Sequence, residues 1–136
     1  MSNAMRRRTI GVLVALAFAM AGGAAAEASC AQGDATGTWR IHVYNDQDFV
    51  RCKIVIGNTG TIVAASSSCR EKANTASSAS GSIKLVSAAG CTFNGTITTA
   101  GDTNTLVEIA VARDKTTLSG VGFVGAEQFI FIGIKQ

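Results

Sequence analysis

The residues of this chain that could perform acid–base or nucleophilic chemistry are few. The chain has one histidine, His42, and the alternation of a β-strand places it on the same face as Arg40 and Tyr44 rather than with Trp39. We interpret His42 as a surface residue. The serines concentrate in residues 66–82, and none of them adjoins the histidine in sequence. We therefore predict no catalytic residues and a protein that is not an enzyme.

Metal and cofactor sites are not predicted either. Asp46 with Asp48, and Asp102 with Asn104, have the spacing of scattered calcium ligands, but neither stretch completes a calcium-binding loop. Asp and Asn also favour turns, because their side chains hydrogen-bond the nearby backbone. We interpret both stretches as turns and expect no metal and no cofactor.

Four cysteines could serve metal binding or disulfide formation, and their spacing favours the second. Cys30, Cys52, Cys69 and Cys91 are 22, 17 and 22 positions apart, so the chain lacks the CxxC pairs typical of zinc sites. An even number of cysteines in a small exported domain predicts two disulfides. Three pairings are possible, and we favour Cys52 with Cys69 and Cys30 with Cys91. Each disulfide is expected to stabilise the fold by about 2–4 kcal/mol.

The N-terminal residues are predicted to be absent from the mature protein. Residues 1–4 precede a second methionine, Met5, and look like a remnant of recombinant expression. Residues 5–26 combine three arginines, an apolar run from Ile10 to Met20 and a small-residue cleavage site, which is the pattern of a secretory signal peptide. The apolar run is short for a spanning helix, so we expect an exported protein, periplasmic or secreted, that does not span a membrane after cleavage. The export route, general secretory or twin-arginine, stays open.

Residues 27–136 are expected to form a single domain without net charge. Of the twelve lysines and arginines in the chain, three lie in the signal peptide, which leaves nine against nine aspartates and glutamates. A neutral domain lacks the basic footprint that nucleic acids require, so we expect no nucleic-acid partner. About 110 residues without internal repeats or a linker suit one small core.

Alternating apolar and polar residues predict an all-β fold. Eight segments show the period-two pattern of strands, separated by turns: residues 39–44, 49–56, 61–65, 82–87, 91–98, 105–112, 117–124 and 129–135. We predict an antiparallel up-and-down meander that closes into a small eight-stranded barrel. The last segment is apolar on both faces. Closure onto the first segment would cover it and remove both edges of the sheet.

One segment does not fit the strand pattern. Residues 66–81 lack any large apolar side chain, so we predict a long exposed loop. Within it, Arg70, Glu71 and Lys72 directly follow Cys69. A disulfide at Cys69 would hold the three charged side chains in a fixed direction and lower the entropy cost of meeting a partner. We therefore take Arg70, Glu71 and Lys72 as a candidate partner-binding loop.

The run Gly37-Thr38-Trp39, followed by Ile54-Val55-Ile56-Gly57 and Gly60-Thr61-Ile62, resembles the opening of calycin-like barrels. This group includes avidins, lipocalins and the bacterial metalloprotease-inhibitor barrels. The resemblance implies an eight-stranded barrel in which Trp39 is a structural anchor that plugs one end. It does not imply biotin binding, because avidin-like sites use several tryptophans and this chain has one. Lys135 takes the place of the lipocalin arginine near the end of the last strand, and the N-terminal trunk of the inhibitors has no counterpart in residues 27–36.

Two functions from different classes remain for an exported barrel whose role the sequence leaves open. The first is a non-catalytic protein-interaction module, including an inhibitor-like one, that acts on an unknown protein through exposed loops. The alternative is a carrier whose barrel interior holds a small apolar ligand and is lined by residues such as Val43, Ile54, Phe93 and Val107. Glycines in the last two predicted strands and the turn between them indicate a tight interior and favour the interaction module: Gly120, Gly122, Gly125 and Gly133.

Overall fold

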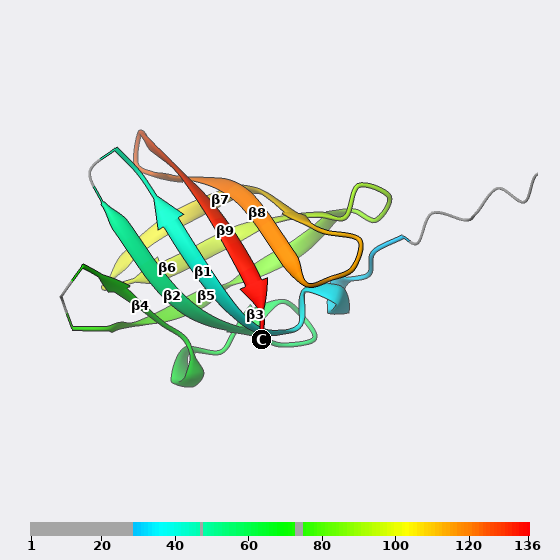
Figure 1. Ribbon diagram of the computed structural model, residues 1–136, viewed down its shortest axis with the longest axis horizontal. Coiled ribbons are helices and arrows are strands. Elements are labelled where there is room, and N and C mark those ends of the chain that lie inside the picture. Colours follow the sequence, from blue (N-terminus) through cyan, green and yellow to red (C-terminus); the bar gives the residue numbers. More distant parts are fainter. Residues whose placement is uncertain (1–28, 47, 73–74) are drawn as a thin grey trace, which may run out of the picture.

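The computed structural model describes residues 29–46, 48–72 and 75–136 (Figure 1). The predicted signal peptide and the four residues before it lie outside the described residues. Within these ranges the chain forms nine strands and two short 3₁₀ helices: η1 (Gln32–Ala35), β1 (Gly37–Tyr44), β2 (Phe49–Ile56), β3 (Thr61–Ile62), η2 (Ala64–Ser66), β4 (Ser68–Glu71), β5 (Ser77–Ser87), β6 (Thr92–Thr99), β7 (Asp102–Val111), β8 (Thr117–Val124) and β9 (Glu127–Lys135). None of the helices found there is long and apolar enough to cross a membrane.

The strands form one closed antiparallel barrel. Strand β1 pairs with both β2 and β9, so the first and last strands of the chain lie side by side. Strands β3 and β4 both lie between β2 and β5, with η2 separating them, and together they fill one position of the barrel. The barrel therefore has eight strand positions. The prediction of an all-β, up-and-down, eight-stranded barrel is confirmed.

The hairpins give the barrel two different ends. The turns that join β1 to β2, β4 to β5, β6 to β7 and β8 to β9 gather at the left-hand end in Figure 1, which we call the mouth. Helix η1 lies at the opposite end, beside the turns from β5 to β6 and from β7 to β8, and we call this the plugged end.

Large side chains fill the plugged end. The largest fully buried side chains are Trp39 of β1, Phe93 of β6 and Ile54 of β2. The Nε1 group of Trp39 donates a hydrogen bond of 2.8 Å to the carbonyl of Ala35 in η1. Lys135 Nζ lies over the indole ring, 5.2 Å from its centroid. Trp39 therefore occupies the position of a structural anchor, with every polar atom of its ring paired.

A glutamine that the sequence analysis did not single out fixes η1 to the wall. The Nε2 group of Gln32 donates to the Ile83 carbonyl at 3.0 Å, and its Oε1 accepts from the Leu85 amide at 2.7 Å. Both backbone groups belong to β5 beyond the point where its pairing with β3 ends at Ser82. The side-chain amide of Gln32 thus makes hydrogen bonds to β5 that the backbone of a longer β3 would otherwise make.

Two glycines of β8 lie opposite two phenylalanines of β9 in the barrel wall. Gly120 pairs with Phe131, and Gly122 pairs with Phe129. A Cβ atom at Gly120 would lie 2.3 Å from the Phe131 ring, which means that the ring lies over the glycine. Gly125 differs, because it lies in the β8–β9 turn with a φ of +58° and nothing within 4 Å of its Cβ position. The predicted close approach therefore applies to this wall and not to Gly125.

Residues 66–81 are not a long loop, and that prediction is wrong. Strand β4 ends at Glu71, and β5 begins at Ser77. Ala79 is fully buried, and Ser67 is nearly so. The Ser67 hydroxyl accepts a hydrogen bond of 2.9 Å from the Val55 amide. Small side chains suit this part of the wall because the backbone ladder, and not apolar burial, holds the segment in place.

A β-bulge in β7 overturns the prediction for Val107. The register of β7 with β8 shifts between Leu106 and Glu108, which inserts one extra residue. Leu106 and Ile109 are buried, whereas Val107 is 51% exposed. A bulge breaks the alternation of inward and outward side chains. Val107 therefore does not line the interior, and Leu106 takes that role.

Both favoured disulfides are present. Cys52 and Cys69 lie opposite each other on β2 and β4, with their Cα atoms 4.0 Å apart. Cys30 and Cys91 join the segment before η1 to the start of β6, with a Cα separation of 5.1 Å. Two disulfides suit an oxidising compartment, which agrees with an exported protein.

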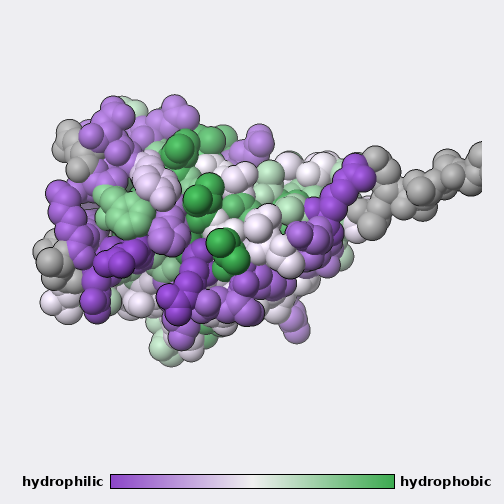
Figure 2. Space-filling view, in the orientation of Figure 1, coloured by the Kyte–Doolittle hydropathy of each residue, from purple (hydrophilic) through white to green (hydrophobic). Residues whose placement is uncertain are grey.

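The last strand is covered at its edge but not on its outer face. The pairing of β9 with β1 satisfies its backbone, as predicted. However, Ile130, Ile132 and Ile134 point outward and are 53%, 51% and 62% exposed. Figure 2 shows a row of strongly hydrophobic residues where Figure 1 draws β9. Barrel closure therefore removes the edge and leaves an apolar stripe on the surface.

Candidate functional site

The interior of the barrel is filled at one end and open at the other. In the plugged half, the remaining void is about 60 Å³ and has a wholly apolar lining that includes Ile54, Ile83 and Phe131. A void of that size has room for about two water molecules, and its lining offers them no hydrogen-bond partner. The plugged half is therefore a packed core with no ligand site.

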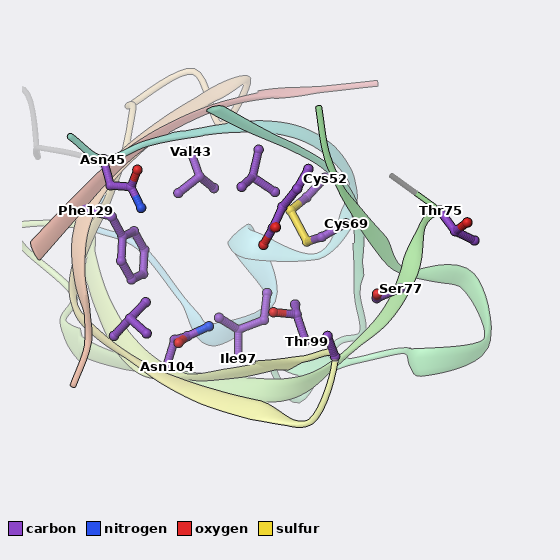
Figure 3. A pocket seen from close by; sticks show the side chains of 14 residues that line it. Val43, Asn45, Cys52, Cys69, Thr75, Ser77, Ile97, Thr99, Asn104 and Phe129 are labelled. Atoms are coloured by element: carbon purple, nitrogen blue, oxygen red, sulfur yellow. A yellow bond between two sulfur atoms is a disulfide. The ribbon is translucent and has the colours of Figure 1, made fainter. Parts of the chain in front are cut away.

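A larger cavity of about 340 Å³ opens at the mouth. This is within the range of small-molecule sites in proteins, at its lower end. One part of the lining is apolar and includes Val50 of β2. Figure 3 shows Val43, Ile97 and Phe129 in the same wall, from β1, β6 and β9. The open barrel mouth is the void that the carrier hypothesis requires.

The polar part of this wall contains an unpartnered amide. Asn104 of β7 projects into the lumen (Figure 3), and its buried Oδ1 atom has no hydrogen-bond partner among the described residues. Asn45, Ser77 and Thr99 add further polar groups around the cavity. A buried acceptor left unpaired costs about 1–3 kcal/mol, so Asn104 provides a position where a ligand donor is favoured.

The Cys52–Cys69 disulfide forms part of the same wall. Both cysteines line the cavity, next to Glu71 at its rim. The disulfide joins β2 to the four-residue strand β4, so it adds a covalent link to the backbone pairing of β4 with β2 and β5 in this wall. The sequence predicted this disulfide correctly but gave no sign that it borders a cavity.

The structure does not bring the candidate loop residues together. Arg70 lies on the outer face beside Arg51, whereas Glu71 faces the mouth cavity. Lys72 forms a salt bridge of 2.6 Å with Asp48, and the hydrogen bond to that carboxylate raises the pKa of Lys72. The three charges point in different directions. They do not share one surface, and their role in binding a partner stays a prediction.

Carboxylates surround the mouth. Five of them lie in the mouth turns or at the strand ends beside those turns: Asp46, Asp48, Glu71, Asp102 and Glu127. Among the described residues of these turns and strand ends, the one basic side chain is that of Lys72. Of the described residues that line the cavity, Glu71 alone is charged, and an excess of negative charge around a concave opening concentrates ligands of the opposite sign. The mouth therefore favours neutral or cationic molecules.

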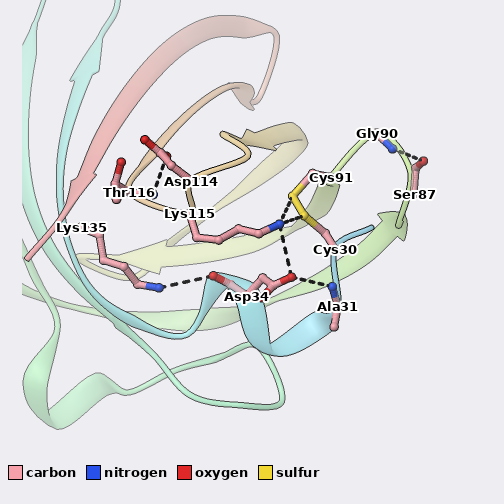
Figure 4. The surroundings of a disulfide bond; sticks show 10 residues. All are labelled: Cys30, Ala31, Asp34, Ser87, Gly90, Cys91, Asp114, Lys115, Thr116 and Lys135. Carbon is pink, nitrogen blue, oxygen red and sulfur yellow. Dashed lines mark hydrogen bonds and ion pairs between the residues drawn. A yellow bond between two sulfur atoms is a disulfide. The ribbon is translucent and has the colours of Figure 1, made fainter. Parts of the chain in front are cut away.

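A second charged cluster lies at the plugged end and has a structural role. Lys115 Nζ contacts Cys30 Sγ and lies 3.4 Å from Asp34 Oδ2 (Figure 4). The Asp34 carboxylate also accepts a 2.8 Å hydrogen bond from the Ala31 amide. This backbone hydrogen bond, together with Lys115, lowers the pKa of Asp34. The cluster fixes η1 against the Cys30–Cys91 disulfide.

His42 lies on the outer face, as its strand phase predicted. Its ring centroid is 5.4 Å from that of Phe49 on β2, and it lines a shallow surface groove with Arg40 and Arg51. Within the described ranges, no group of three or more His, Cys, Asp or Glu side chains could hold a metal ion.

Comparison with known proteins does not assign this chain to a family. No known protein family matches it, and no curated protein is detectably similar in sequence.

Proposed function

We propose that this protein is an exported carrier that binds a small amphipathic molecule in the mouth of its barrel. The observation that carries the proposal is the cavity of about 340 Å³, which lies above a plugged and packed lower half. This arrangement favours the carrier over the protein-interaction module, because Arg70, Glu71 and Lys72 do not form one surface.

The resemblance to calycin-like barrels supports the same proposal. Trp39 opens β1, is fully buried at the plugged end and has Lys135 beside its ring, as a barrel of that group would have. We therefore propose that the protein belongs with these barrels in architecture and binds its ligand at the end opposite the tryptophan.

The cavity wall specifies the chemistry of the ligand. Val43, Ile97 and Phe129 offer an apolar surface for a hydrophobic body. The unpartnered Oδ1 of Asn104 calls for a hydrogen-bond donor, and Glu71 at the rim favours a positive charge. The ligand that fits best is a compact apolar group carrying an amine or hydroxyl.

Fluorescence titration with three naphthalene compounds tests this proposal. The compounds share one ring system and carry an aminomethyl, hydroxymethyl or carboxymethyl group. We expect the ammonium compound to bind most tightly and the carboxylate most weakly. Asn104→Leu should weaken the alcohol about fivefold, which corresponds to one neutral hydrogen bond, and should weaken the ammonium compound at least tenfold, because its hydrogen bond carries a charge. Glu71→Gln should reduce the preference for the amine over the alcohol.

Variants that fill the cavity give the decisive control. Ile97→Trp and Thr99→Phe place bulk in the lumen from β6 and should abolish binding of all three compounds. Val86→Thr alters an exposed position on β5, remote from the cavity lining, and should leave binding unchanged. Thermal denaturation of each variant establishes that it is folded. If no compound binds, or if a folded cavity-filling variant still binds, the carrier proposal is wrong.

A further inference from the structure

The outer face of the barrel carries an apolar stripe that the mouth site does not explain. The stripe consists of Ile130, Ile132 and Ile134 on β9, each more than half exposed. In the register of β9 with β1, these residues lie beside Tyr44, His42 and Arg40, respectively. Three large aliphatic side chains in an unbroken row on an exposed face are typical of an interaction surface.

Four cations lie next to this stripe on the same outer face. Arg40 pairs with Lys53 across β1 and β2, and Arg51 pairs with Arg70 across β2 and β4. We call these four residues the basic cluster. They border one groove of about 400 Å³, whose lining contains no carboxylate. Within the described residues, no salt bridge joins any of the four to an acidic side chain.

Like charges directly opposite each other on a sheet are destabilising. The domain is neutral as a whole, so the concentration of cations on one face is not a consequence of overall charge. Figure 2 shows the two features together, with hydrophilic side chains over β1 and β2 directly beside the hydrophobic row on β9. The basic cluster has the features of a surface that meets an anion.

Two aromatic residues complete the face at the mouth end of the stripe. Tyr44 and Phe49 are both exposed, and their ring centroids are 5.1 Å apart. Tyr44 lies beside Ile130 in the strand register. Tyr44 has an aromatic ring with one polar tip, and such rings are enriched where a protein meets the boundary between lipid tails and headgroups, while Phe49 adds apolar area.

We propose that this face docks on the surface of an anionic lipid bilayer. The stripe and the aromatic pair would enter the boundary between headgroups and acyl chains, while the basic cluster meets the lipid phosphates. A bilayer presents an apolar layer and an anionic layer side by side, which matches the order of chemistry across β9, β1 and β2. The barrel would lie on its side. This proposal is independent of the ligand site at the mouth.

The geometry favours a bilayer over a second copy of this chain. If two copies met through their stripes, the basic cluster of each would face either the other basic cluster or the outer face of β8. The β8 residues beside the stripe are Thr117, Ser119 and Val121, which carry no charge, and on the next strand, β7, Glu108 opposite Val121 sets one carboxylate against four cations. The stripe is also on a convex wall, which a deformable bilayer can contact without a matching groove.

Vesicle flotation with the exported form of the chain tests the proposal, once mass spectrometry has established its N-terminus. The probes are vesicles of phosphatidylethanolamine with 30% phosphatidylglycerol and vesicles of phosphatidylcholine alone. We expect the protein to float with the anionic vesicles, to float at least tenfold less with the neutral ones, and to be released by 0.5 M salt.

Matched variants separate the two parts of the face. The triple variant Arg40→Gln, Arg51→Gln and Arg70→Gln should lower the partition coefficient by about fivefold per residue removed. Ile132→Ser with Ile134→Ser should lower it at least tenfold and leave the salt dependence in place. The controls are Lys84→Gln and Val86→Ser, which change an exposed cation and an exposed apolar residue on β5.

Four outcomes overturn the proposal. The first is absence of binding to anionic vesicles by folded wild-type protein. The second is equal binding by wild type and the variants of the proposed face. The third is displacement by millimolar inorganic phosphate, which identifies a site for small anions. The fourth is a stable dimer that the isoleucine variant dissociates, which identifies the stripe as an interface between two copies.

Discussion

Removing the Trp39 side chain tests the origin of stability at the plugged end. The indole is fully buried, and truncation of such a side chain to alanine costs about 3–5 kcal/mol. Trp39→Phe keeps most of the apolar contact but removes the donor to the Ala35 carbonyl, which is itself in a fully buried residue. Loss of that donor leaves a buried acceptor unpaired and should cost about 1–3 kcal/mol. The two variants thus separate packing from hydrogen bonding.

Urea denaturation followed by circular dichroism measures both changes, because the variants lose the intrinsic tryptophan signal. A loss of 3–5 kcal/mol should lower the melting temperature by roughly 12–20 °C in a domain of this size. Val86→Ala serves as the control at an exposed position, where the change should stay within about 0.5 kcal/mol. A loss below about 1 kcal/mol for Trp39→Ala would mean that the indole does not anchor the fold, and the assignment of the plugged end would fail.

Two further predictions concern packing and pH. Gly120→Ala should destabilise the barrel by about 1–3 kcal/mol in urea denaturation, because the new Cβ would meet the Phe131 ring, whereas Gly33→Ala should have little effect. A loss at Gly33 equal to that at Gly120 would refute the packing argument. The lowered pKa of Asp34, due first to its hydrogen bond with the Ala31 amide, means that the ionised carboxylate stabilises the fold above its unfolded value of 3.8. Urea denaturation from pH 6 to pH 2 should show a constant difference in unfolding free energy between wild type and Asp34→Asn down to about pH 5. This difference should shrink as the pH falls through the pKa of Asp34 in the folded protein. A difference that persists at pH 2 would contradict the prediction.

The strand alternation predicted most of this fold because one side of each strand faces a packed core. Positions such as Ile54 and Phe93 are buried where period two places them, and the even number of cysteines predicted two disulfides, of which the favoured pairing is present. The prediction failed where the backbone departs from regular pairing. The bulge beside Val107 follows from the register of β7 with its neighbours, and no residue type in the segment indicates it.

The prediction of a long loop over the Ser- and Ala-rich residues 66–81 failed for a different reason. Composition predicts disorder when a segment must order itself by apolar burial. Here the neighbouring strands supply the hydrogen bonds, so that Ser67 and Ala79 can be buried without large side chains. A similar limit applies to Asn104, which has turn composition but continues the inward face of Leu106.

The candidate site was less predictable than the fold, because it depends on what the side chains leave empty. Sequence can place Ile97 on an inward face, but it does not show whether opposing residues meet across the lumen. Nor could it show that Arg70 and Glu71 point to opposite sides of the wall.

The plugged end and the mouth are separate parts of the barrel, and this separation determines where amino-acid substitutions are tolerated. The tryptophan, η1 with its glutamine anchor, and the largest buried side chains all belong to one half of the barrel. The residues that shape the cavity belong to the other half and its hairpins. Substitutions among the residues that line the cavity should therefore cost less stability than substitutions at the plugged end, so the shape and polarity of the cavity can change while the packed half stays the same.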